Sequence, residues 1–383
     1  MHFKTKSPQY KTWIEISKSS LLHNLKQFKK MVGTKTKIAA VVKANAYGHG
    51  LYEVVGILNT SCDWFCVDSI EEGLMVRRLT PKPILILGYT PLSRLKEAVM
   101  NDLSIVVYNN ASIEKIINLN LPKKAKLHIK VETGLNRQGV KGESLLSFAE
   151  YILKNNKKLY LEGMSTHFAN IEDTLDPSFA KLQLKKFKEA ISQLKRNGIN
   201  PLLIHCAASA ATFLYPDTRF NMVRAGIALY GLWPSRETKI ALRIRKRKLI
   251  LKPVLSWKSM VVQVKEIGAG ESVGYGRTWI APRKTKIAII PIGYADGYDR
   301  KLSGSSRVLI KGKFAPVIGR VAMNMIVIDI SSIKNVSIED EVVLIGLSGK
   351  ERISVEEVAE KIGTINYEVV ARIASSIKKV VVT

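Results

Sequence analysis

The chain has 383 residues, of which 60 are Lys or Arg and 32 are Asp or Glu, so its formal net charge at pH 7 is +28. Hydrophobic residues make up 46% of the sequence, which suffices for a large core and excludes collagen-like, low-complexity and charge-driven disordered chains. The length favours two or three domains, because one core rarely exceeds about 250–300 residues. The basic charge leaves nucleic acid or an anionic membrane open as partners.

The cysteines and the N-terminus give an expectation of the cellular compartment. Cys62, Cys66 and Cys206 have neither the spacing of a disulfide framework nor that of a zinc site, so we expect a reducing compartment and no metal. Residues 1–17 contain no apolar run long enough for a signal peptide, and no stretch approaches 18 consecutive apolar residues. A cytoplasmic protein without a membrane span is expected.

The first part of the chain alternates short apolar runs with amphipathic stretches. Strands are predicted at 37–44, 63–69, 83–88, 104–109, 126–133, 160–168, 202–209 and 222–231. Helical spacing of apolar residues marks 19–32, 69–79, 112–121 and 179–198, the last of which ends at Gly198. Eight such units predict an α/β fold with an N-terminal (β/α)8 barrel of the TIM type. An open doubly wound sheet also fits the alternation, but it rarely has eight units.

The second part is rich in strands. Apolar segments at 254–267, 286–297, 307–321, 325–332 and 341–346 are separated by Gly, Ser and Asp turns, and one helix is expected at 354–363 with Ser354 as its N-cap. We therefore predict a barrel domain at 1–250 and a mainly-β domain at 251–383, joined by the basic segment 243–253. An N-terminal strand at about 10–17 is expected to pack on the second domain.

A lysine follows the first predicted barrel strand, in the run Val41-Val42-Lys43-Ala44-Asn45-Ala46-Tyr47-Gly48-His49-Gly50. A lysine that leaves a β-branched strand is partly desolvated, which lowers its pKa toward the neutral amine that Schiff-base chemistry requires. The alternative is a lysine that only extends from the barrel mouth into water.

This run resembles the cofactor-lysine motif of bacterial alanine racemases, which are fold-type III pyridoxal-phosphate enzymes. Similar blocks follow in the family's order at 130–140, 165–169, 220–231, 272–279, 292–298, 318–325 and 366–373. The resemblance implies an N-terminal barrel with a C-terminal β-domain, in agreement with the strand and helix pattern.

The resemblance also implies a mechanism with two bases. Lys43 would carry pyridoxal 5'-phosphate as an aldimine and act as the base for the D-enantiomer, and Tyr275 would act on the L-enantiomer. In the family this tyrosine comes from the partner subunit, so a homodimer is expected. A tyrosine needs positive charge or a hydrogen bond to serve as a base at neutral pH, and His167 is the neighbouring candidate. Without the resemblance, Tyr275 could equally be a turn residue between two glycines.

The remaining cofactor contacts follow from the same blocks. Arg224 would face the pyridine nitrogen and, because arginine keeps its proton, leave that nitrogen unprotonated; otherwise it is a barrel arginine paired with a carboxylate. His167 would pack on the ring, although a lone strand histidine is usually a core residue. The expected phosphate ligands are Tyr47, Ser209, Gly226, Ile227 and Tyr367, with Ser209 also a candidate helix N-cap.

Substrate contacts are implied at three further positions. Arg137 and the main-chain N–H of Met323 would bind the α-carboxylate. Lys130 would be carbamylated, which turns a cation into an anion that holds the arginine. Tyr294 and Tyr367 would narrow the entrance.

The implied activity is the interconversion of L- and D-alanine, which supplies D-alanine for peptidoglycan. Ala208, Asn324 and Asn366 depart from the residues that are frequent in the family, and Asn324 leaves a serine or broader amino-acid racemase open. A decarboxylase and a regulatory cofactor-binding protein fit the second domain less well. No helix–turn–helix or interleaved aromatic platform supports a specific nucleic-acid partner, and the basic cluster at 243–248 is interpreted as a solvated interdomain face.

Overall fold

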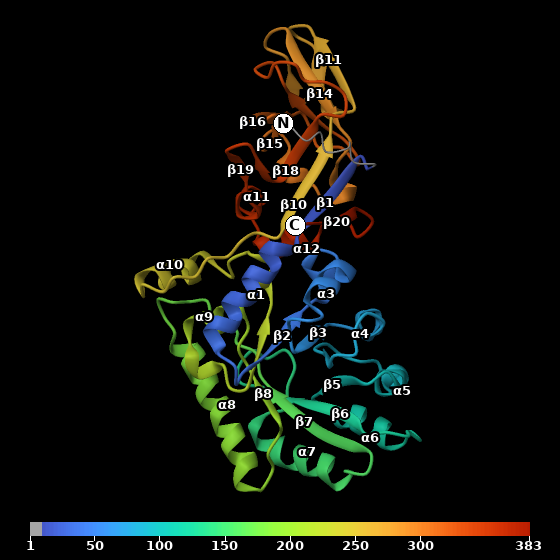
Figure 1. Cartoon of the computed structure of the whole chain (residues 1–383), viewed down its shortest axis with the longest axis vertical. Helices are drawn as coiled ribbons and strands as arrows, with labels where there is room; N and C mark the ends of the chain where they lie inside the picture. The colour runs from blue at the N-terminus through green and yellow to red at the C-terminus, as the bar shows by residue number, and fades with distance from the viewer. Residues whose placement is uncertain (1–9) are drawn as a thin grey trace. The chain divides into compact units, whose positions relative to one another are not determined.

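The computed structural model describes residues 10–383 and divides into two compact units (Figure 1). The barrel unit comprises residues 20–46 and 54–252. The sheet unit comprises the described residues up to Ser19, the segment Tyr47–Glu53 and Pro253–Thr383. The short segment 47–53 therefore belongs to the sheet unit, although residues 20–46 before it and 54–252 after it belong to the barrel unit.

The barrel unit contains eight parallel strands in the order β8-β7-β6-β5-β4-β3-β2-β9. Their bounds are β2 (Lys37–Val41), β3 (Trp64–Val67), β4 (Ile84–Ile86), β5 (Leu103–Val107), β6 (Ala125–Lys130), β7 (Leu159–Ser165), β8 (Leu203–His205) and β9 (Met222–Ala225). The barrel is nearly closed, since the ladder is continuous except between β8 and β9. All eight predicted strands are present, which confirms the predicted fold class.

Helices alternate with these strands along the chain (Figure 1). They are α1 (Lys18–Val32), α3 (Leu51–Leu58), α4 (Ile70–Arg77), α5 (Leu95–Met100), α6 (Asn110–Ile117), α7 (Gly142–Lys154), α8 (Ser178–Arg196), α9 (Ser209–Leu214) and α10 (Arg236–Ile244). Helix α8 buries Ala180, Gln183, Phe187, Ala190 and Leu194, one stripe at three- and four-residue spacing. The four helices predicted in this part of the chain are confirmed.

The sheet unit is built on a ten-stranded sheet with the order β11-β14-β17-β16-β15-β18-β10-β1-β20, and β19 pairs with β18. The bounds are β1 (Thr12–Ser17), β10 (Leu255–Met260), β11 (Gln263–Ile267), β14 (Thr285–Ile290), β15 (Arg307–Ile310), β16 (Lys313–Ile318), β17 (Ile326–Asp329), β18 (Glu341–Ser348), β19 (Glu351–Ile353) and β20 (Lys378–Val382). Strand β1 pairs antiparallel with β10 and parallel with β20.

Smaller elements complete the sheet unit. A hairpin joins β12 (Ser272–Val273) to β13 (Trp279–Ile280), and two helices, α11 (Val355–Ile362) and α12 (Asn366–Ala371), follow the sheet strands. Ser354 caps α11 by accepting a hydrogen bond from the Glu357 N–H at 3.1 Å, as predicted. The hairpin, α12 and β20 were not predicted as elements. No helix within residues 10–383 is long and apolar enough to cross a membrane.

Candidate active site

Lys43 lies two residues beyond the end of β2, at the carboxyl ends of the barrel strands. Its Nζ is 3.0 Å from Oδ1 of Asp68, which directly follows the neighbouring strand β3. The lysine side chain is 39% exposed. The side chain therefore leaves the strand partly buried, with a carboxylate as its partner, and the expected amine chemistry stays a prediction. Asp68 was not predicted, although a carboxylate directly after the adjacent parallel strand was a usable signal.

The backbone after Lys43 is left-handed. Ala44, Asn45, Ala46 and Tyr47 have φ angles between 52° and 54°, a conformation that costs roughly 1–2 kcal/mol per residue for L-amino acids. The Glu72 carboxylate stabilises the start of this turn by accepting from the N–H groups of Ala44 at 2.6 Å and Asp68 at 2.9 Å. The turn aims the chain away from the barrel strand directly after the lysine.

Arg224 on β9 is only 4% exposed and its guanidinium is held by several acceptors. Nη1 donates to Nδ1 of His205 at 2.6 Å and to the His205 carbonyl at 3.1 Å. Nη2 lies 3.0 Å from the Thr166 carbonyl, 3.1 Å from the Cys206 carbonyl and 3.3 Å from Nδ1 of His167. These acceptors are backbone carbonyls and imidazole nitrogens.

His167 and Arg224 lie together in the barrel unit. Burial and then the positive charge of Arg224 hold the pKa of His167 well below its usual value, so the imidazole is neutral. Its Nδ1 faces the arginine as an acceptor. A neutral His167 supplies no positive charge to a tyrosinate and can assist one only by a hydrogen bond.

Ser209, Gly226 and Ile227 form a group of buried backbone N–H donors. The Oγ of Ser209 accepts from the N–H groups of Gly226 at 3.2 Å and Ala228 at 3.4 Å. Ala228 belongs to the 3-10 helix η3 (Ile227–Tyr230) that follows β9. The N-cap of α9 is Ala208, so the alternative of Ser209 as the N-cap was wrong. Clustered N–H groups and a hydroxyl of this kind suit a phosphate.

Lys130 ends β6, and Arg137 lies in the loop that follows. Burial, followed by the charges of Arg224 and Arg137, holds the pKa of Lys130 well below its usual value. No ion pair joins either cation to a carboxylate among the described residues. Among the described residues, two basic groups without an ion-paired carboxylate therefore occupy this end of the barrel.

Tyr47 and Tyr367 lie together within the sheet unit. Their ring centroids are 6.3 Å apart, and Tyr367 is the second residue of α12. Gly48 allows the close approach, because a Cβ there would overlap the carbonyl of Val370 on the same helix. Two expected phosphate ligands that are distant in sequence are thus brought together.

Tyr275 begins the 3-10 turn η4 (Tyr275–Arg277) at the tip of the β12–β13 hairpin. Gly274 and Gly276 on either side have φ angles of 73°, which glycine adopts readily. The tyrosine side chain is 74% exposed. The phenol therefore lies exposed on the sheet unit, at the tip of a hairpin whose turn has a glycine on either side of the tyrosine.

Met323 and Tyr294 belong to two loops of the sheet unit that pack on each other. The N–H groups of Tyr294 and Ala295 donate to the carbonyls of Ala322 at 3.1 Å and Met323 at 3.0 Å. A Cβ at Gly293 would overlap both carbonyls, so glycine is required there. Met323 is exposed, and so is the neighbouring Asn324.

Sequence reasoning missed three polar residues that the barrel buries behind Arg224. His205, His128 and Glu162 lie on β8, β6 and β7 within otherwise apolar strands. They lack a spacing motif, but a polar residue inside each of three apolar barrel strands was a signal that could have found them. Within residues 10–383, no group of His, Cys, Asp and Glu side chains is suited to hold a metal ion.

The chain combines a parallel barrel, which has a lysine beyond its first strand, with a β-sheet unit. This combination defines a class of two-unit barrel enzymes. The model of the alanine racemase N-terminal domain matches residues 16–234, and that of the C-terminal domain matches 254–381. The chain belongs to the alanine racemase family, whose members are isomerases.

Individual relatives agree over nearly the full length. Alanine racemase of Leptospira interrogans is 40% identical over 377 residues, covering 97% of this chain and 96% of the relative. That of Desulforamulus reducens is 39% identical over 374 residues, covering 96% and 98%. The crystal structure of alanine racemase from Bacillus anthracis with bound L-Ala-P matches with a TM-score of 0.91 and 35% identity, covering 98% of this chain and 96% of that one.

Proposed function

We propose that the chain interconverts L- and D-alanine with pyridoxal 5'-phosphate, with Lys43 and Tyr275 as the two bases. The observation that carries the proposal is Arg224, a buried guanidinium fixed as a donor inside a barrel whose first strand leads to Lys43. The relatives named alanine racemase, which match over nearly the whole chain, support the same reaction.

The donor set fits pyridoxal phosphate. Lys43 supplies an amine for covalent attachment, Arg224 a donor for the ring nitrogen, and Ser209, Gly226 and Ile227 a hydroxyl and N–H groups for the phosphate. Tyr47 and Tyr367 add two phenols. When bound, the cofactor withdraws electrons from the Cα–H bond of the attached amino acid and makes that proton acidic.

Arg224 sets how far that withdrawal extends. Arginine does not release its proton in proteins, so Arg224 would donate a hydrogen bond to the ring nitrogen and would leave that nitrogen unprotonated. Protonation at the cofactor's own carbon, which leads to transamination, is thereby disfavoured. His167 packs beside the arginine as a neutral acceptor and leaves this donor in place.

Racemisation needs a proton removed on one face of Cα and returned on the other. We assign Nζ of Lys43 to the face of the D-enantiomer and Oη of Tyr275 to the face of the L-enantiomer. In the proposal Tyr275 comes from a second copy of the chain, so that the enzyme is a homodimer. The outward presentation of Tyr275 supports this, since an exposed phenol on a glycine-held hairpin is free to enter another copy.

Arg137 and the N–H of Met323 are assigned to the substrate carboxylate, and Lys130 to a carbamate that would hold Arg137. Tyr294 and Tyr367 are assigned to the entrance, where they would favour small amino acids. The role of the enzyme would be to supply D-alanine for peptidoglycan in the cytoplasm.

A turnover assay with purified protein tests the function. With added pyridoxal phosphate, L-alanine is expected to give D-alanine at a higher kcat/KM than L-serine or larger amino acids give their enantiomers. Lys43→Ala is expected to abolish turnover. Protein that binds pyridoxal phosphate on Lys43 but racemises no amino acid would contradict the proposal, and a preference for serine would support the broader racemase that Asn324 leaves open.

A further inference from the structure

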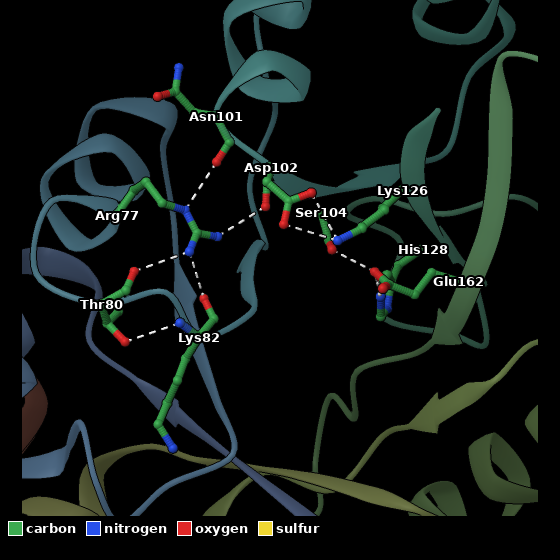
Figure 2. A network of polar contacts seen from close by, with 9 residues as sticks. All are labelled: Arg77, Thr80, Lys82, Asn101, Asp102, Ser104, Lys126, His128 and Glu162. Atoms are coloured by element: carbon green, nitrogen blue, oxygen red, sulfur yellow. Dashed lines mark hydrogen bonds and ion pairs between the residues drawn. The ribbon is translucent and has the colours of Figure 1, made fainter. Parts of the chain in front are cut away.

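A chain of buried polar side chains extends from Arg224 through the barrel interior. Nδ1 of His205 accepts from Arg224, Nε2 of His205 is 3.0 Å from Nδ1 of His128, and Nε2 of His128 is 3.1 Å from Oε2 of Glu162. The same carboxylate oxygen accepts from the hydroxyl of Ser104. Figure 2 shows Ser104 and His128 directed toward Glu162. All five side chains are buried.

The two ends of this chain fix the direction of every hydrogen bond in it. Arginine can only donate, so Nδ1 of His205 is unprotonated and its Nε2 carries the proton. That proton is donated to Nδ1 of His128, which leaves the His128 proton on Nε2, where it is donated to Glu162. The Glu162 carboxylate can only accept, so it also requires a proton on Nε2 of His128.

A doubly protonated His128 would break this order. Its Nδ1–H would donate to Nε2 of His205 and leave the His205 proton on Nδ1, opposite the Arg224 donor at 2.6 Å. Burial and then the charge of Arg224 hold the pKa of His205 well below its usual value, so His205 is neutral as well. The hydrogen bonds from His128 and Ser104 outweigh burial and lower the pKa of Glu162, which keeps it a carboxylate.

The barrel is shaped to hold this arrangement. A Cβ at Gly163 would overlap Nδ1 of His128, so the glycine beside Glu162 makes room for the ring. The β6–β7 register shifts between Leu127 and His128 at this point. The Trp64 ring meets His128 edge-on, with 6.0 Å between the centroids. The imidazole is therefore confined on several sides.

We propose that Glu162 is a positioning residue: it fixes which ring nitrogen is protonated in two histidines and thereby keeps Nδ1 of His205 as the acceptor that orients Arg224. The consequence for catalysis rests on the proposed function, because the group that Arg224 would face is the proposed cofactor. The order of protonation in the two histidines does not depend on that function. A histidine tautomer fixed by a carboxylate is known to matter greatly to catalysis in other enzymes.

Solid-state ¹⁵N NMR of the full chain, labelled in its histidines and loaded with pyridoxal phosphate, tests the proposal. His128 and His205, assigned with variants at each position, are expected to be neutral with protonated Nε2 and unprotonated Nδ1. A proton on Nδ1 of His205 would overturn the proposal. If the protein fails to racemise alanine but shows these tautomers, the proposed function fails and the proposed order of protonation stands.

Glu162→Gln supplies the variant. The amide carries no charge and can present N–H instead of oxygen to His128, so a second His205 signal with protonated Nδ1 is expected, together with a loss of racemisation on the order of 10-fold. Asp102→Asn is the matched control, because Asp102 is a carboxylate on the same side of the barrel that pairs with Lys126 outside the chain of hydrogen bonds (Figure 2). Unchanged histidine signals and rates in Glu162→Gln would overturn the role of Glu162.

Discussion

At the scale of single residues, Lys130 and Arg137 stand out because neither cation has a carboxylate partner in the described chain. Glu132 lies between them in sequence, but its carboxylate accepts from the N–H groups of its own loop, including that of Gly134. Burial holds the pKa of Lys130 well below its usual value, which favours the neutral amine. The nitrogen can then bond to the carbon of carbon dioxide and release one proton, which leaves an anion beside the arginine.

Carbamylation of Lys130 is therefore a prediction for this site. Protein equilibrated with ¹³C-bicarbonate should show one carbamate resonance that is absent from Lys130→Ala, and this variant should raise the KM for alanine by about 10-fold through the loss of a charged hydrogen bond. Lys126→Ala, which removes a half-buried lysine of the same strand that pairs with Asp102, should keep the resonance. Wild-type protein without a carbamate signal would contradict the assignment.

Residues within motifs could be predicted from sequence, and residues that act only through three-dimensional contacts could not. His167, which lies beside Arg224, and Tyr47, which lies beside Tyr367, were both identified from motifs. The partners Asp68 and His205 were missed because each is far in sequence from the residue that it contacts and belongs to no local motif.

At the scale of elements, the left-handed turn at 44–47 and the helix α12 show how backbone geometry positions side chains. The turn leads into the segment 47–53, whose Gly48 packs against Val370 of α12. That contact brings the phenols of Tyr47 and Tyr367 to the same place. A change that separates these two backbones should weaken phosphate binding without touching a ligand.

Gly48→Ala tests this packing. The added Cβ would overlap the Val370 carbonyl, so the free energy of unfolding should fall by about 3 kcal/mol or more and the Kd for pyridoxal phosphate should rise. Gly363→Ala is the control, because Gly363 has a similar φ of 73° and no atom within 4 Å of its Cβ position; its cost should be only about 1 kcal/mol. Thermal denaturation and cofactor titration of both variants measure the difference. Equal effects of the two substitutions would contradict the packing role of Gly48.

Strong periodicity made the barrel strands and the long helices predictable, and α8 is the clearest case. Elements without periodicity were missed. The β12–β13 hairpin has two residues in each strand, and α12 has six residues. Their positions depend on the backbone conformations of glycines and on packing against segments that are distant in sequence. A local pattern of apolar residues contains neither kind of information.

At the scale of the whole molecule, the net charge of +28 has a partly structural explanation. Within the basic cluster at 243–248, Arg245 and Arg247 donate to the carbonyls of Leu214 and Phe213 at the end of α9, and Arg245 also lies over the Tyr215 ring. Cations at a helix C-terminus are favourable. These two arginines stabilise the barrel unit.

The central claim is that Lys43 of one copy and Tyr275 of another form one two-base site. Lys43→Ala and Tyr275→Phe should each be inactive as purified proteins, since each lacks one base in every site. In mixed dimers of the two variants, isolated through two different affinity tags, one of the two sites would regain both bases. The most direct test is the racemisation rate of these mixed dimers: about half of the wild-type rate per dimer is predicted, and inactive mixed dimers, or single variants that remain active, would contradict the claim.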